Sequence, residues 1–179
     1  MLKIVLLIGA IIVSAGLIVV LIGFLLPKQH VASRAITLHR KPEDLFQLIS
    51  DFKAAPSWRP DVREVELLPP LGGHICYREK GSNGNLTMEI VESNSPSRLV
   101  TRIVDKGLPF GGIWIFDISP TREGCRLNIT ERGEIYNPVF RLASRFLMGY
   151  NRTLDTYLQN VSRKFEEPSL PEDGTAASL

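Results

Sequence analysis

Three hydrophobic patterns follow one another along this chain. Residues 4–26 form an apolar run without a charged side chain. Between residues 62 and 134, apolar and polar residues alternate in short segments that Pro, Gly and Ser separate. From residue 138 to 165, apolar residues recur at steps of three and four. These periods are typical of a membrane-spanning helix, of the strands of a sheet and of an amphipathic helix, respectively.

The apolar run predicts a single-pass membrane anchor over residues 1–28. As a helix, its ~23 residues span about 34 Å, slightly more than the ~30 Å hydrocarbon core of a bilayer. A cleavable signal peptide is the competing interpretation, but its apolar region is usually only about 7–15 residues long. Lys28, Arg34, Arg40 and Lys41 follow the run, whereas Lys3 precedes it. This asymmetry favours a cytoplasmic position for the domain that follows.

The alternating segments predict an antiparallel sheet of about seven strands. The first strand is expected over Val31–Leu38, and a helix that Pro42, Glu43 and Asp44 open is expected after it. Further strands are expected over residues 62–68, 74–79, 86–92, 99–104, 111–118 and 125–134. Their connections are short, which makes neighbouring strands antiparallel.

The last pattern predicts one long helix that covers the sheet. Asn137 is a good N-cap, and Pro138 suits the first helical position. The helix is expected to run without interruption to Phe165, which is about 28 residues or 42 Å. Because a sheet with one apolar face needs cover, this helix is expected to supply it. The domain is therefore assigned to residues 29–166, and a disordered tail is expected over residues 167–179.

Composition narrows the choice of partners. The net charge is +2, with 44% hydrophobic and 22% charged residues, which is a globular mixture. No basic stretch with interleaved aromatic residues is present, so we expect no nucleic-acid partner. The two cysteines, Cys76 and Cys125, lie in strand-like segments and are expected to be buried free thiols.

No catalytic motif stands out. The chain lacks G-x-S-x-G, H-E-x-x-H and C-x-x-C, and His74-x-Cys76 offers two metal ligands where three or four are usual. The sequence therefore predicts no catalytic constellation, no metal site and no cofactor, and it favours a protein that is not an enzyme. Tyr77 and Glu131 are the nearest candidates for acid–base chemistry.

Several motifs in a fixed order carry a family likeness. They are Pro42-Glu43-Asp44-Leu45-Phe46, Trp58-Arg59-Pro60, Trp114-Ile115-Phe116, Asn137-Pro138-Val139-Phe140-Arg141 and Leu154-Asp155-Thr156-Tyr157-Leu158. Together they resemble the START-like, or SRPBCC, superfamily in its polyketide cyclase/dehydrase-like branch. The resemblance covers about residues 31–165. It implies an α+β helix-grip fold, in which a curved antiparallel sheet wraps a long C-terminal helix, here with an added N-terminal transmembrane helix.

The resemblance also implies an apolar cavity between sheet and helix. Its expected lining residues are Trp58, Tyr77, Met88, Trp114, Phe116, Phe146 and Tyr150; the alternative is that these are ordinary core residues. The leading hypothesis is a membrane-anchored module that binds a hydrophobic small molecule or a lipid. The rivals are a cyclase- or dehydratase-type enzyme that acts on a hydrophobic substrate and a non-binding, tethered interaction domain.

Overall fold

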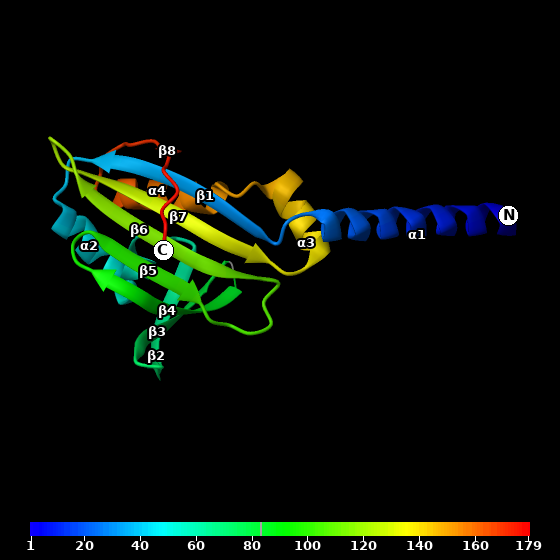
Figure 1. The fold of residues 1–179 in the computed structure, drawn as a ribbon, viewed down its shortest axis with the longest axis horizontal. Coiled ribbons are helices and arrows are strands. Elements are labelled where there is room, and N and C mark those ends of the chain that lie inside the picture. The colour runs from blue at the N-terminus through cyan, green and yellow to red at the C-terminus, as the bar shows by residue number, and fades with distance from the viewer. Residues whose placement is uncertain (83) are drawn as a thin grey trace.

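The structure is a computed structural model that describes residues 1–82 and 84–179. The helical elements are α1 (Leu2–Leu25), α2 (Pro42–Ser50), the 3₁₀ turn η1 (Phe52–Ser57), α3 (Pro138–Ala143), the π-helical turn η2 (Ser144–Met148) and α4 (Arg152–Lys164). The strands are β1 (Gln29–Leu38), β2 (Val62–Leu71), β3 (His74–Gly81), β4 (Gly84–Asn94), β5 (Arg98–Ile103), β6 (Phe110–Pro120), β7 (Cys125–Ile135) and β8 (Glu172–Asp173). Figure 1 shows their arrangement.

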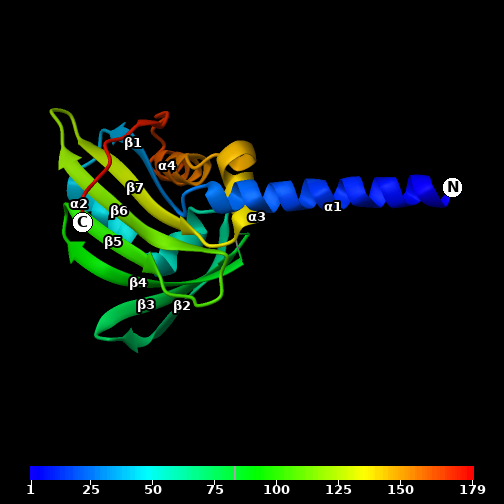
Figure 2. The same ribbon diagram turned by 45° about the vertical axis from the view of Figure 1, so that its right-hand side comes forward.

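The strands form a single antiparallel sheet. Within the described residues it has eight strands in the order β2-β3-β4-β5-β6-β7-β1-β8. Strands β2 to β7 follow one another as a meander, and β1 pairs with β7 over its whole length, from Gln29 opposite Glu134 to Leu38 opposite Cys125. The sheet curves around α4 (Figure 2). The predicted α+β helix-grip class is confirmed.

The inner face of the sheet, which faces α4, holds the hydrophobic core. Phe116 on β6 lies opposite Leu99 on β5 and Ile129 on β7, and all three side chains are buried. The matching stripe of α4 is Leu154, Tyr157, Leu158 and Val161. Each fully buried Leu, Ile or Val of this size stabilises the fold by about 1.5–3 kcal/mol.

The predicted uninterrupted helix from Pro138 to Phe165 is wrong. The segment is divided into α3, η2 and α4, and Gly149 lies between η2 and α4 with φ of 72°. That left-handed backbone conformation favours glycine, and glycine inside a helix costs about 1 kcal/mol relative to alanine. A stripe at steps of three and four is equally compatible with two shorter helices, so the pattern alone could not reveal the interruption.

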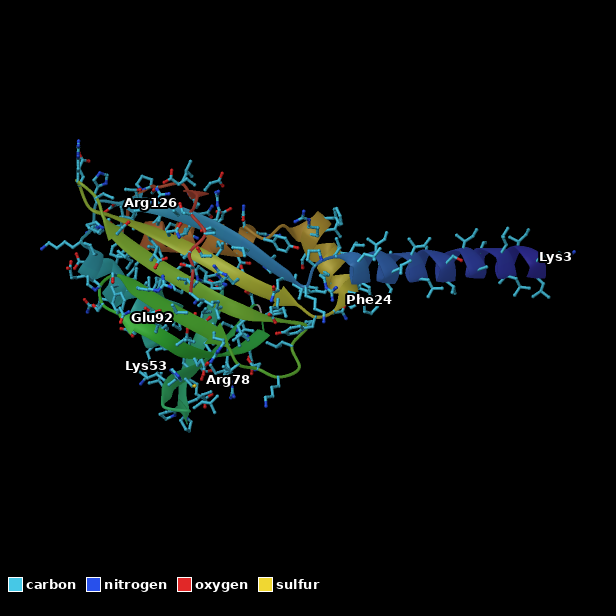
Figure 3. The ribbon with its side chains drawn as sticks, viewed as in Figure 1. Lys3, Phe24, Lys53, Arg78, Glu92 and Arg126 are labelled. Carbon is cyan, nitrogen blue, oxygen red and sulfur yellow. The ribbon has the colours of Figure 1, made fainter. Side chains whose placement is uncertain are left out.

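Helix α1 is 24 residues long and extends away from the sheet (Figure 1). It is long and apolar enough to cross a membrane, and a signal sequence has the same properties. Figure 3 shows Lys3 at its far end and Phe24 at the end next to the domain. There, Gly23 is buried against the backbone of Pro138, the first residue of α3.

The C-terminal residues lie along the sheet, in the stretch 167–179 where the sequence predicted disorder. In β8, Asp173 and Glu172 pair with Arg34 and Ala35 of β1. Beyond β8, the Ala177 amide donates to Thr130 Oγ1, and the Arg132 guanidinium donates to the Ala177 carbonyl. The tail therefore crosses β1 and β7 on the side of the sheet opposite α4.

Candidate functional site

Three predicted site residues surround one tyrosine of α4. The ring centroids of Trp58, Trp114 and Phe116 lie 5.4, 5.7 and 5.5 Å from that of Tyr157. Tyr157 itself is buried. Alternation along β6 places Trp114 and Phe116 on one face, and the end of η1 brings Trp58 against Tyr157 of α4. The result is an aromatic cluster at the centre of the inner face.

Tyr77 and Met88 extend the same face toward the other edge of the sheet. They lie opposite each other on β3 and β4. Tyr77 is buried and stacks on Phe52 of η1, with ring centroids 4.1 Å apart and planes at 18°. Met88 is partly buried. These two side chains therefore share the aromatic inner face with Trp114.

The remaining two predicted residues lie elsewhere. Phe146 belongs to η2 and is 66% exposed, so it lies apart from the aromatic cluster. Tyr150 follows the interruption at Gly149 and stacks on His30 of β1, with ring centroids 4.0 Å apart. Because the predicted helix is divided, Phe146 and Tyr150 do not lie on the same helix face as Leu154 and Tyr157. The lining role of all seven residues stays a prediction.

A buried charge cluster adjoins the aromatic residues, and sequence reasoning did not identify it. The Arg59 guanidinium donates to Glu79 Oε1 at 2.7 Å and to Asp61 Oδ2 at 2.8 Å. Its Cζ atom also lies 5.2 Å from the centre of the Tyr157 ring. Burial by itself lowers the pKa of Arg59, but the charges of Glu79 and Asp61 outweigh it and raise that pKa above its ordinary value.

Burial and the charges of this cluster shift the pKa values of two tyrosine hydroxyls. Burial, followed by the charge of Glu79, raises the pKa of Tyr77 well above its usual value. Burial also raises the pKa of Tyr157, with Arg59 acting in the opposite direction. Both phenols are therefore neutral at physiological pH and retain a hydroxyl proton that can be donated to an oxygen atom of a ligand.

Two buried donors in this region have no partner within the described part of the protein. Among the described residues, Trp58 Nε1 and Arg59 Nε have no hydrogen-bond partner, although both atoms are buried. An unsatisfied buried donor costs about 1–3 kcal/mol. A ligand that carries an acceptor would remove this cost. Trp58 and Arg59 both lie in the Trp58-Arg59-Pro60 motif, but their burial depends on the fold.

A second polar group lies at the other end of the inner face. His30 Nε2 lies 3.7 Å from Glu131 Oε1, and both side chains are mostly buried. Glu131 sits opposite Trp114 across β6 and β7. In the described part of the chain, His30 Nδ1 is buried and has no partner. Sequence reasoning found no partner for His30; the pairing of β1 with β7, which brings residues 101 positions apart into contact, supplies it.

Two hollows on the surface of the described residues each include one residue of the Tyr150–His30 stack. One, of about 490 Å³, lies between β1 and the start of α4; Tyr150 lines it together with Val31, Ala32, Gly149, Asn151, Arg152, Asp155, Thr156 and Gln159. The other, of about 400 Å³, includes His30, Ile113, Arg132 and Tyr136. Tyr150, on the wall of the first hollow, stacks on His30, which pairs with Glu131 on the inner face. We call the first hollow the α4 groove.

A curved antiparallel sheet closed on a C-terminal helix, with an aromatic and polar inner face, defines a START-like helix-grip domain. Residues 29–166 match the family model described as polyketide cyclase / dehydrase and lipid transport. The chain belongs to this family. No curated protein matches it by sequence.

Solved structures show the same fold at low sequence identity. A START superfamily protein from Mycobacterium smegmatis has a TM-score of 0.62 and 19% identity, over 76% of this chain and 97% of that one. Norcoclaurine synthase from Thalictrum flavum has a TM-score of 0.60 and 12% identity, over 78% and 87%. The di-domain ARO/CYC StfQ of the steffimycin biosynthetic pathway has a TM-score of 0.60 and 12% identity, over 75% and 50%. At these identities the likeness concerns the fold.

Proposed function

We propose that this protein is a membrane-anchored module that holds a hydrophobic small molecule or a lipid between the sheet and α4. The observation that carries the proposal is the pair of buried donors without a partner, Trp58 Nε1 and Arg59 Nε, beside the aromatic cluster around Tyr157. A family described by cyclases, dehydrases and lipid transport supports ligand binding as the general activity.

The inner face suits a ligand that is mostly apolar and carries one or two oxygen atoms. Burial of apolar ligand surface against Trp58, Trp114 and Phe116 would contribute about 25 cal/mol per Å². The Trp58 indole and the Tyr77 and Tyr157 hydroxyls would orient the ligand through its oxygen atoms. A ligand would reach this face through the α4 groove, which has Tyr150 on its wall.

Anchoring rests on α1. Its 24 residues correspond to about 36 Å of helix, enough for a hydrocarbon core of about 30 Å. The basic residues that follow α1, among them Lys28 and Arg34, favour a cytoplasmic position for the domain. In this arrangement the binding domain stays next to the lipids from which a hydrophobic ligand would come.

A cyclase- or dehydratase-type activity is the second candidate, and one observation favours it. His30 and Glu131 form a shielded pair at 3.7 Å on the same face as the aromatic cluster. Such a pair can take a proton from a bound substrate and return it to another atom. Trp114, opposite Glu131 in the sheet, would hold an apolar substrate beside the pair.

Native mass spectrometry of the full-length protein in detergent, followed by organic extraction, tests the binding proposal. We expect a stoichiometric lipid or other hydrophobic molecule to be bound. Trp58→Phe keeps an aromatic ring but removes the unpartnered donor, so the affinity for the ligand should fall about fivefold, which corresponds to about 1 kcal/mol. Occupancy should fall accordingly when the ligand is limiting. Tyr136→Phe, which removes an exposed hydroxyl, is the control and should retain the ligand.

Two results would contradict the proposal. One is a protein that carries no ligand and takes up none from lipid vesicles. The other is a ligand whose occupancy is the same in Trp58→Phe, Tyr136→Phe and the unsubstituted protein. Turnover of a captured molecule that is abolished by Glu131→Gln would instead establish the enzymatic alternative.

A further inference from the structure

One arginine connects the end of α1 to α3. Arg141 of α3 is buried, and its guanidinium donates to four carbonyl groups, each at 3.0 Å. Two of these carbonyls, of Gly23 and Leu26, belong to the C-terminal end of α1. The others belong to Ile135 and Tyr136. A cation is favourable at a helix C-terminus, where carbonyl groups lack helical partners.

This connection fixes the position of α3 along the axis of α1. Gly23 packs directly on Pro138, and it lies two residues before the end of α1 at Leu25. At 1.5 Å per residue, the contact is about 3 Å from the helix end. If α1 spans a bilayer, its ends lie near the boundary between hydrocarbon and headgroups, and α3 must then lie at the same boundary.

The segment held there exposes large apolar side chains. Phe146 and Leu147 of η2 are 66% and 82% exposed, and Val139 of α3 is 46% exposed. Single exposed apolar residues are common, but three within nine positions beside a membrane-spanning candidate form a local patch. Figures 1 and 2 both show α3 against the end of α1 nearest the domain.

All charged side chains between residues 135 and 154 are positive. Between Glu134 and Asp155 the sequence contains no acidic residue, but it contains Arg141, Arg145 and Arg152. Arg145 is exposed next to Phe146, and Lys28 is exposed just after α1. Apolar side chains flanked by exposed cations are typical of segments that lie in the bilayer interface, where phosphate groups are above the acyl chains.

We propose that α3 and η2 form an interfacial segment that lies in the surface layer of the same bilayer that α1 spans. Phe146 and Leu147 enter the upper acyl region, and Arg145 contacts lipid phosphates. The inference rests on the anchoring part of the proposed function. The occupant of this patch is the bilayer, because the patch is continuous with the membrane-spanning helix and carries the charge that complements lipid phosphates.

The interfacial segment also determines where the α4 groove lies relative to the membrane. Gly149 and Tyr150, which line the groove, follow η2 directly. With η2 in the interface, the groove opens at the membrane surface. A lipid-like ligand would then reach the Tyr150–His30 stack from the bilayer, without a passage through water.

Site-directed spin labelling of the full-length protein in nanodiscs of phosphatidylcholine and phosphatidylglycerol tests the inference. Nitroxide labels at Leu147→Cys, Leu170→Cys and Val13→Cys report bilayer depth through collision with oxygen and with a water-soluble nickel complex. Leu170 is a matched control, because this leucine is 85% exposed and lies in the tail near β8. Val13 lies in the middle of α1. The protein with only its native, buried cysteines gives the background.

We expect the oxygen-to-nickel collision ratio to be highest at Val13→Cys, and severalfold higher at Leu147→Cys than at Leu170→Cys. A deep label at Val13→Cys with equal ratios at the two leucine positions would overturn the interfacial segment and leave the anchor intact. A water-exposed label at Val13→Cys would overturn the anchor and the interfacial segment together. Ligand binding is measured separately, so its failure would not be mistaken for either result.

Discussion

The Arg141 guanidinium donates a 3.0 Å hydrogen bond to the carbonyl oxygen of Gly23, a residue 118 positions earlier in the chain. The same nitrogen also donates to the Leu26 carbonyl. The C-terminal end of α1 thus meets α3 at one buried side chain. Helix α1, which precedes the domain, is joined to it by this contact and by the short segment of Pro27 and Lys28 that leads into β1.

Arg141→Met should loosen this contact. The substitution keeps an unbranched side chain but removes the donor from four carbonyl groups, which we expect to cost about 2–4 kcal/mol. Hydrogen exchange at the amides of residues 135–137 and 139–141 should become much faster. Arg145→Met, a neighbouring change at an exposed position, is the control. Equal exchange rates in both variants would show that Arg141 does not hold the two helices together.

Gly23→Ala should separate α1 from α3. A Cβ atom at residue 23 would collide with the Pro138 carbonyl oxygen, which is backbone and cannot move aside cheaply. Gly16→Ala is matched to it in the same helix, with open space around its Cβ. Proteolysis near residues 26–30 should accelerate in Gly23→Ala and remain unchanged in Gly16→Ala. Similar cleavage of both would contradict the close packing at Gly23.

Arg59→Met should destabilise the domain by about 2–4 kcal/mol, because Glu79 and Asp61 would lose the cation that pairs with them in a mostly buried site. Arg63→Met, on the exposed side of β2, should change stability by less than about 0.5 kcal/mol. Thermal unfolding of the full-length protein in detergent measures both. A loss that is the same for the two variants would mean that the buried ion pairs contribute no more than a surface charge.

Alkaline pH should weaken the fold. Burial, followed by the negative charges of Glu167, Asp44 and Glu43, raises the pKa of the Cys125 thiol to about 11. Burial likewise raises the pKa of Tyr77 and Tyr157. Because these pKa values are higher in the folded state, their contribution to stability is complete below the unfolded pKa and is lost as pH rises through the folded one.

The unfolding temperature should therefore be nearly constant from about pH 7 to 9 and fall steadily from about pH 9 to 11. Cys125 should also resist thiol reagents at pH 9, while the unfolded protein reacts. Cys125→Ala should flatten the first part of the decline. A stability that increases above pH 9, or rapid labelling of Cys125 in the folded protein, would contradict this assignment.

Local patterns predicted most of the elements. The apolar segment 111–118 was predicted to be a strand, and the structure has that strand as β6, Phe110–Pro120. Short connections indicated the antiparallel order, and the pairing of neighbouring strands confirms it. Each of these features depends on residues within about ten positions of one another, so one sequence contains the necessary information.

The features that local patterns did not predict depend on contacts between residues far apart in the chain. The pair of Arg59 and Glu79 requires η1 to return over β3, and the pair of His30 and Glu131 requires the register of β1 against β7. The interruption at Gly149 depends on a backbone conformation that a helical stripe does not encode. Glu131 was named from the sequence, but its pairing with His30 and the cluster around Arg59 were not. The aromatic residues were named from the resemblance, and their role as a cavity lining stays a prediction.

The C-terminal tail affects whether neighbouring copies of this protein can pair through the edge of the sheet. Without β8, β1 would be an open edge whose free N–H and C=O groups could pair with a strand of another molecule. Arg34 holds the tail in place through Asp173 at 2.5 Å and binds Asp155 of α4 at 2.6 Å. If α1 anchors the protein in a membrane, molecules meet repeatedly in a plane, and the cover at Arg34 and Ala35 would hinder pairing of neighbouring sheets into a continuous ribbon.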